Sequence, residues 1–240
     1  MTGRRPDTAQ QSFFRDHGWL SVRDGLAADE LVELQQRTRP LIERRAELCH
    51  DLSRVEQGGE NVLISAMELA WPDWRSSRFH QGCADAATRL MGRPVQFWYN
   101  LLLIKPPRDG ARTWWHQDEG CIGGSPEDLI ITCWIPLQDV DEENGCMRFL
   151  DRGHRLGILP GLHETGGRSG LAACGVDESG VVSVPLRAGG MTWHHGKTPH
   201  ASPPNLSPRF RLALIQRFTV VGVPIPTGHL EDGSPAAGQG

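Results

Sequence analysis

The segment Trp114–Gly120, Trp-Trp-His-Gln-Asp-Glu-Gly, places an imidazole and a carboxylate two residues apart. In a β-strand, residues i and i+2 point to the same face, so His116 and Asp118 would face one point in space. Such a pair could bind a metal ion, or it could be an ordinary hydrogen-bonded surface pair. Because His-x-Asp occurs often by chance, a metal site is indicated only if a third ligand can be found.

A histidine-rich segment further along the chain offers that third ligand. It begins with His194 and His195, continues to His200 and ends with Arg211. If a late strand pairs beside an early one, one of these histidines could share a cavity with the first pair. Two histidines and one carboxylate on one face of a metal form the facial triad of non-haem Fe(II) oxygenases, which leaves the other positions open for reactants.

Helical patterns occupy the first part of the chain. We expect helices over 10–17, ended by Gly18, over 28–48 with a break or kink at Pro40, and over 77–91, ended by Gly92. After Pro94 the pattern changes, and strands are expected over 95–104, 113–118, 129–137, 146–150, 181–184, 191–195 and 210–221. Helices first and many short strands afterwards predict a mainly β protein with flanking α-helices, either an antiparallel barrel or a double-sheet jelly roll.

Two further stretches bear on domain organisation. The sequence predicts one domain over 1–225 and a flexible tail over 226–240, which is rich in Gly, Pro and Ala. The glycine-rich stretch 153–180 is long for a connection in a compact domain, so we expect a functional or mobile lid there. Asn144-Gly145 is a strong signal for a tight turn between two strands.

Composition narrows the function classes. There is no apolar run of about 18 residues and no secretory signal, so neither a membrane span nor export is expected. The net charge of −4 argues against a nucleic-acid partner. The six cysteines form no Cys-x-x-Cys pair, which argues against a zinc ribbon and favours reduced thiols in a cytoplasm. The oligomeric state is left open.

In order and spacing, these motifs resemble the phytanoyl-CoA dioxygenase-like family of Fe(II)/2-oxoglutarate-dependent oxygenases. The resemblance spans roughly 13–218, with His116-Gln117-Asp118 as the proximal motif, 128–134 and 144–146 following, and His200, Ser202, Asn205 and Arg211 as the distal motif. The family places its arginine eleven residues after the metal histidine, which selects His200. It would make His195 a neighbour of the ligand and turn His194 the other way.

The resemblance implies a double-stranded β-helix, that is, a cupin-like jelly roll, and it assigns roles. The metal ligands would be His116, Asp118 and His200. Arg211 would hold the distal carboxylate of 2-oxoglutarate, since a planar guanidinium can bind a carboxylate through two charge-assisted hydrogen bonds. Ser202 would be a second donor and Trp134 a wall of that pocket. The alternatives are a strand-end arginine in a salt bridge, a turn serine and a core tryptophan.

The sequence allows two interpretations for several nearby side chains. Gln117 should point away from the ligands and could support them. Trp114 and Trp193 could line a substrate pocket or fill the core. Lys105 is read as a solvated strand end. Arg209, two residues before Arg211, could be mistaken for the carboxylate-binding arginine.

The resemblance also implies a reaction. Fe(II), 2-oxoglutarate and O2 would together remove a hydrogen atom from a C–H bond, giving hydroxylation, cyclisation or epimerisation. Halogenation is disfavoured because Asp118 is present. A composition rich in Arg, Gly, Ala and Pro suggests a high-GC bacterium, whose small family members tailor secondary metabolites of antibiotic biosynthesis. We therefore expect a bulky, partly apolar substrate such as a polyketide or its glycoside. The alternatives are an acyl-thioester or amino-acid-derived hydroxylase and a non-catalytic jelly-roll binding protein.

Overall fold

The structure, a computed structural model, describes residues 5–44, 54–55, 59–64, 71–108, 110–120, 129–159 and 178–224. Its helices are α1 (Thr8–His17), α2 (Ala28–Glu43) and α5 (Arg78–Met91), with 3-10 turns η1 (Trp74–Ser76), η3 (Gly153–Leu156) and η4 (Glu178–Gly180). Its strands are β1 (Trp19–Val22), β2 (Arg54–Val55), β3 (Gly59–Glu60), β4 (Val62–Ile64), β5 (Val95–Lys105), β6 (Thr113–His116), β7 (Ile130–Pro136), β8 (Met147–Leu150), β9 (Val181–Val184), β10 (Met191–His195), β11 (His200–Ser202) and β12 (Arg211–Val220). The predicted tail over 226–240 and most of the predicted lid lie outside the described residues.

The helices begin and end at residues that the sequence marks. Ser77 caps α5 by accepting a hydrogen bond from a backbone N–H of its first turn, and left-handed glycines, Gly18 and Gly92, end α1 and α5. The predicted helices over 10–17 and 77–91 are thus confirmed. The helix that starts at residue 28 continues through Pro40 and ends at Glu43. No helix within the described residues is both long and apolar enough to cross a membrane.

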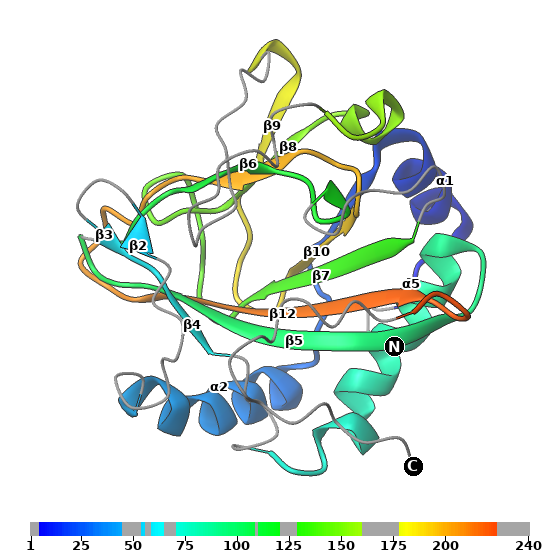
Figure 1. Cartoon of the computed structure of the whole chain (residues 1–240). Helices are drawn as coiled ribbons and strands as arrows, with labels where there is room; N and C mark the ends of the chain where they lie inside the picture. Colours follow the sequence, from blue (N-terminus) through cyan, green and yellow to red (C-terminus); the bar gives the residue numbers. More distant parts are fainter. Residues whose placement is uncertain are drawn as a thin grey trace.

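Two antiparallel sheets face each other, as expected for a jelly roll, and β2 and β3 form a separate two-stranded sheet (Figure 1). The larger sheet has the order β1-β10-β7-β12-β5-β4, and the smaller has the order β6-β11-β8-β9. The predicted strands match to within one or two residues, but five strands were missed: β1, β2, β3, β4 and β11. The predicted strand over 113–118 ends at His116, because the chain turns there and Glu119 N–H donates to the carbonyl of Gly196.

Two apolar layers hold the sheets and helices together. Between the sheets, Trp134 of the larger sheet packs with Phe149 and Val184 of the smaller one. On the other face of the larger sheet lie α2 and α5 (Figure 1). They contribute buried side chains such as Leu34 and Phe79. Burying both faces of the larger sheet fixes which side chains of its strands face the space between the sheets. The functional residues are found in that space.

Candidate active site

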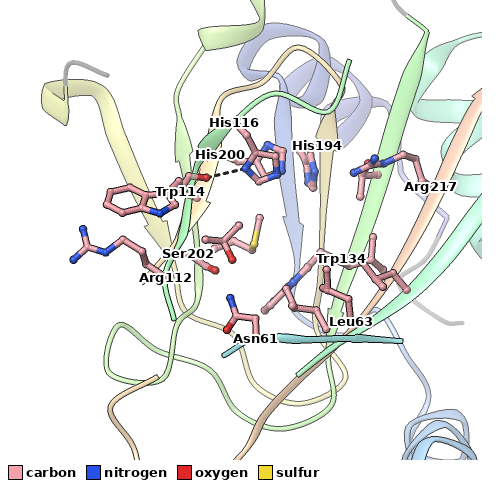
Figure 2. Close-up of a pocket in the computed structure, with 17 residues that line it drawn as sticks. Asn61, Leu63, Arg112, Trp114, His116, Trp134, His194, His200, Ser202 and Arg217 are labelled. Carbon is pink, nitrogen blue, oxygen red and sulfur yellow. Dashed lines mark hydrogen bonds between the residues drawn. The ribbon is translucent and has the colours of Figure 1, made fainter. Parts of the chain in front are cut away.

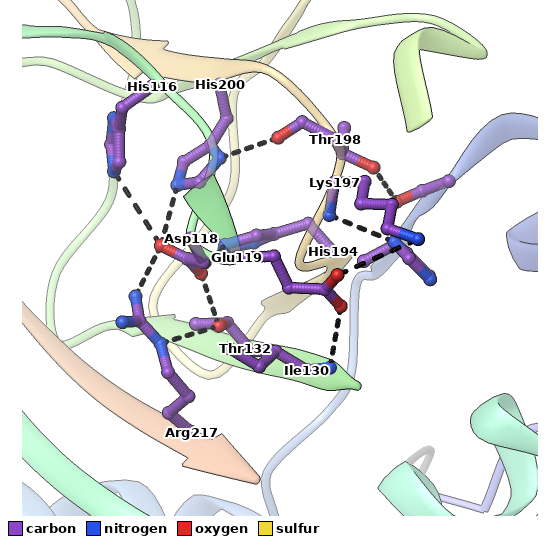
Figure 3. A network of polar contacts seen from close by, with 12 residues as sticks. His116, Asp118, Glu119, Ile130, Thr132, His194, Lys197, Thr198, His200 and Arg217 are labelled. Atoms are coloured by element: carbon purple, nitrogen blue, oxygen red, sulfur yellow. Dashed lines mark hydrogen bonds and ion pairs between the residues drawn. The ribbon is translucent and has the colours of Figure 1, made fainter. Parts of the chain in front are cut away.

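Strand pairing brings the three predicted metal ligands together. His116 of β6 lies directly opposite His200 of β11 in the antiparallel register, and their ring centroids are 4.0 Å apart. Asp118 follows β6 in a turn, and its Oδ1 atom is 3.8 Å from Nε2 of His116 and 3.7 Å from Nε2 of His200 (Figure 3). Within the described residues, these three form a group whose possible ligand atoms all lie within 4.8 Å of one another.

Backbone carbonyls orient both imidazoles for metal binding. Nδ1 of His116 donates to the carbonyl oxygen of Trp114, and Nδ1 of His200 donates to that of Thr198, each over 2.9 Å. Because a carbonyl can only accept, the ring hydrogen is on Nδ1 and the Nε2 lone pair faces Asp118. Burial, with a further contribution from the adjacent imidazoles, lowers the pKa of both histidines to about 3, so both rings are neutral near pH 7.

The Asp118 carboxylate is buried and has different partners on its two oxygens. Oδ2 accepts hydrogen bonds from the Thr132 hydroxyl at 2.6 Å and from His194 Nε2 at 3.2 Å. Oδ1 faces the two imidazoles and also accepts a hydrogen bond from the Arg217 guanidinium. Burial acts to raise the pKa of Asp118, but Arg217, with His200 and His194, holds it well below its usual value. The ligand is therefore ionised and held in one orientation.

The expected positions of the two histidines of β10 were wrong. His194 points into the site, where its ring centroid is 4.1 Å from that of His200, whereas His195 points to the opposite face and lies 5.6 Å from the ring of His154. Alternation along a strand allows only one of the two to face the space between the sheets. The family spacing does not specify which histidine faces inward, because that orientation depends on how β10 pairs with β7 in the larger sheet.

The donor set fits a ferrous ion. Two neutral imidazole nitrogens and one carboxylate oxygen, all directed at one point, are the facial triad that binds non-haem Fe(II) and leaves positions open. The hydrogen bonds that the two imidazoles donate to carbonyls, and the one that Asp118 accepts from Thr132, are the outer contacts that keep such ligands in place. His116, Asp118 and His200 would hold the metal.

A second polar site lies behind Ser202, where the guanidinium of Arg211 is fully buried. Its Nη2 donates to the Ser202 hydroxyl at 3.2 Å, and its Cζ lies 5.6 Å from the centre of the Trp134 ring. Nε and Nη1 have no hydrogen-bond partner within the described part of the chain. Burial lowers the pKa of Arg211 to about 9, which still leaves it charged near neutral pH. The predicted grouping of Arg211, Ser202 and Trp134 is thus present.

Lys105 is a basic residue of this second site that the sequence interpretation missed. It pairs directly opposite Arg211 on the neighbouring strand, and it is fully buried instead of being a solvated strand end. Its Nζ donates to the carbonyls of Ser202 at 3.2 Å and Pro203 at 2.6 Å. Burial and the nearby guanidinium lower the pKa of Lys105 well below its usual value. Among the described residues neither Arg211 nor Lys105 pairs with a carboxylate, so the site with its buried guanidinium fits an anionic ligand.

A cavity of about 180 Å³ connects the two sites (Figure 2). It contains the His116 and His200 imidazoles, Ser202 and the indole of Trp134, and its other walls are mainly apolar. The lining also includes Asn61, Leu63, Leu101, Leu103, Arg112, Thr113, Trp114, Thr132, Met147, His194, Ala201, Ile215 and Arg217. Trp114 and Trp193 could each have lined a pocket or filled the core. Trp114 lines the cavity, whereas Trp193 packs in the core against the helices. A chelating acid could therefore reach the metal and the buried cations together.

The remaining motif residues support the chain around the site. Gln117 points away from the ligands, and its amide donates to the carbonyls of Lys197 at 2.6 Å and Gly157 at 2.7 Å. Its oxygen accepts from Leu159 N–H at 2.8 Å, so it anchors the first residues of the predicted lid. The Asn205 amide donates to the carbonyl of Arg209 at 2.7 Å and organises the turn before β12. The side chain of Arg209 is exposed, which excludes it as the buried carboxylate-binding arginine.

Gly145 in the predicted tight turn should tolerate no side chain. Its φ is +94°, and an added Cβ would lie 2.7 Å from the carbonyl oxygen of Pro203. Gly222 has a similar φ of +91° but open space around it, so it is a matched control. We expect Gly145→Ala to lower the free energy of unfolding by roughly 2–4 kcal/mol and Gly222→Ala by about 1 kcal/mol, because only the first adds a clash to the backbone strain. Urea unfolding measures both, and equal losses would contradict the clash.

Comparisons with known proteins agree with this geometry. The model of the phytanoyl-CoA dioxygenase (PhyH) family matches residues 14–213. Phytanoyl-CoA dioxygenase domain-containing protein 1 of Rattus norvegicus is 28% identical over 160 residues, which are 64% of this chain and 55% of that protein. A probable phytanoyl-CoA dioxygenase of Caenorhabditis elegans is 23% identical over 228 residues, 85% of this chain and 72% of that protein. The chain thus spans little more than half the length of the rat relative.

Two solved structures resemble the whole fold. EvdO2 from Micromonospora carbonacea var. aurantiaca, complexed with 2-oxoglutarate, is 26% identical with a TM-score of 0.75, over 92% of this chain and 95% of that one. The epimerase SnoN, in complex with Fe3+, alpha ketoglutarate and nogalamycin RO, is 26% identical with a TM-score of 0.77. The match covers 97% of this chain and 91% of that one. Since the family model covers most of the chain, the predicted ligands form one group, and Arg211 lies behind Ser202 of the same cavity, this chain belongs to the phytanoyl-CoA dioxygenase family of non-haem Fe(II)/2-oxoglutarate dioxygenases.

Proposed function

We propose that this protein uses Fe(II), 2-oxoglutarate and dioxygen to remove a hydrogen atom from a C–H bond of a bulky, partly apolar secondary metabolite, a polyketide or its glycoside. One observation carries the proposal: a single cavity joins the His116, Asp118 and His200 donor set to Ser202, behind which the fully buried Arg211 has two nitrogens without partners. This arrangement suits a dicarboxylic acid that chelates the metal with one end and pairs with the guanidinium at the other. 2-Oxoglutarate is such an acid.

The residues of this chain bind and orient the reactants. Iron, with its co-substrate and dioxygen, supplies the oxidising power for breaking the C–H bond. His116 and His200 are neutral and already oriented, so they can ligate without losing a proton. Arg211 would hold the distal carboxylate of the co-substrate, with Lys105 beside it on the neighbouring strand, and Trp134 would form a wall of that pocket. The apolar walls keep water away from the reacting atoms.

The substrate class rests on the cavity walls and on the two similar structures. Leu63, Leu101, Leu103 and Ile215 provide an apolar surface, and the Trp114 indole adds an aromatic one. SnoN, which is described as an epimerase, holds nogalamycin RO, and this chain is 26% identical to it. Such walls favour a partly apolar substrate, and a polycyclic or glycosylated one has this character. The hydrogen abstraction would end in hydroxylation, cyclisation or epimerisation.

Two measurements, made one after the other, test the proposal. Anaerobic addition of Fe(II) and then 2-oxoglutarate should produce a weak visible charge-transfer band, which a non-catalytic jelly-roll protein would not show. With air, turnover of 2-oxoglutarate to succinate should then be stimulated by a polyketide or its glycoside more than by acyl-CoA thioesters or amino acids. A band without selective stimulation by the first class would refute the substrate assignment, and the lack of any band would refute the oxygenase itself.

A further inference from the structure

The guanidinium of Arg217 lies directly at the metal-ligand carboxylate. Arg217 is on β12, and its Nη2 donates to Oδ1 of Asp118, while its Nε donates to the Thr132 hydroxyl at 3.2 Å (Figure 3). Its side chain is 11% exposed and lines the cavity. In Figure 2 it lies to the right of the paired imidazoles, beyond His194, whereas Ser202 lies below them. Arg217 is therefore separate from the two cations that fit the distal carboxylate.

An irregularity in the sheet holds this guanidinium in place. The β12–β5 register pairs Arg217 with Tyr99 and the next residue, Phe218, with Phe97, so Trp98 is one extra residue on β5. Such bulges re-aim side chains, and they are frequent beside active sites. The Arg217 Cζ lies 5.6 Å from the centre of the Trp98 ring and 4.9 Å from that of Tyr99. Cation–π contact with two rings keeps the guanidinium against the carboxylate.

A metal ion and Arg217 require the same oxygen atom. Oδ1 is the atom of Asp118 that faces Nε2 of both histidines, at 3.8 and 3.7 Å, and it is also the acceptor for Arg217. A divalent ion seated there would lie close to the guanidinium in a buried site, where repulsion between like charges is poorly screened. The other oxygen, Oδ2, accepts its hydrogen bonds from Thr132 and His194 and not from Arg217.

We infer that Arg217 is a resident cation that competes with the metal for Asp118 and thereby lowers the metal affinity of the site. This inference rests on the proposed metal-dependent function. Arg217 is a positioning residue in the metal-free protein, where it neutralises a buried carboxylate that faces two imidazoles. The competing interpretation is that Arg217 only supports Asp118. The two interpretations differ in sign: if Arg217 competes, its removal tightens metal binding, and if it only supports the carboxylate, its removal weakens binding.

The test is a titration with Co(II) alone, without 2-oxoglutarate, substrate or dioxygen. Binding is monitored through the visible absorption of the bound ion. Wild type is compared with Arg217→Met and Arg217→Gln, which remove the charge, and with Arg217→Lys, which keeps it. Arg209→Met removes an exposed arginine from the turn before the same strand and is the control. We expect the two neutral variants to bind Co(II) about tenfold or more tightly, and the lysine and control variants to stay within about threefold of wild type.

Thermal melting of the same proteins gives an independent readout. Without metal, Arg217→Met should melt at a lower temperature than wild type, because it leaves a buried carboxylate without its charged partner. The increase in melting temperature on adding Co(II) should be larger for the neutral variants. Arg217→Gln retains a hydrogen-bond donor, so it provides the comparison if the methionine variant does not fold.

The outcomes separate this inference from the proposed function. If wild type binds Co(II) and neither neutral variant binds it more tightly, the competition is refuted while the metal site stands. If the control tightens binding as much as the neutral variants, the effect is one of general charge and the inference is again refuted. If wild type shows no binding at all, the proposed metal-dependent function fails and the competition fails with it.

Discussion

Replacing His200 with alanine is expected to lower the affinity for Fe(II) by roughly a thousandfold or more, because one of three protein ligands is lost. The neighbouring variant His194→Ala should lower it by only about 10–100-fold, the range for residues that orient a ligand. Among the described residues, His194 is not in the group of possible ligands that His116, Asp118 and His200 form. It donates to Oδ2 of Asp118 over 3.2 Å and so holds the carboxylate in position.

The measurement is an anaerobic Fe(II) titration of both variants, with circular dichroism to check that each is folded. A His154→Ala variant is a suitable control, since that imidazole lies beside His195, on the other side of β10 from the ligands. The ligand assignment would be wrong if the alanine variants at 194 and 200 lost equal affinity. It would also be wrong if the control lost as much as either of them.

The sequence predicts those site residues that local spacing identifies. His116 and Asp118 are two residues apart, and the distance from His200 to Arg211 is a family pattern, so all four could be assigned before any fold was known. The turn at Gly145 is likewise local, and its positive φ agrees with the Asn-Gly signal. Local patterns also place the two capped helices, because capping residues lie within one turn of the helix ends.

What could not be predicted depends on pairings between distant strands. Lys105 at the end of an apolar run looks like a solvated strand end, and only its pairing with Arg211 shows that it is buried. The inward face of β10 follows from its pairing with β7, which is why His194 and His195 were assigned to the wrong sides. The three-residue strand that carries His200 has no pattern of its own, and it forms because β6 and β8 pair on either side of it.

The second large effect concerns the co-substrate. Arg211→Met should raise the concentration of 2-oxoglutarate required for half-maximal activity by roughly a hundredfold to a thousandfold, because a bidentate charge-assisted pair is lost from a buried site. The KM for the main substrate should change by less than about threefold, since the guanidinium lies behind Ser202 and does not line the cavity. Fe(II) affinity should be unchanged, because none of the three ligands contacts Arg211 in the described structure.

Two comparisons make this prediction specific. Ser202→Ala removes a single neutral donor and should raise the requirement by only about three- to tenfold, whereas Arg209→Met, at an exposed position, should leave it unchanged. Arg211→Lys should behave more like the methionine variant than like wild type, because an ammonium keeps the charge but cannot form two parallel hydrogen bonds to one carboxylate. The dependence of the anaerobic charge-transfer band on 2-oxoglutarate gives the same ranking without turnover. If Arg211→Met shows an unaltered 2-oxoglutarate dependence, the two unpartnered nitrogens of Arg211 bind something else, and the carboxylate site must be sought around Lys105 or Arg112.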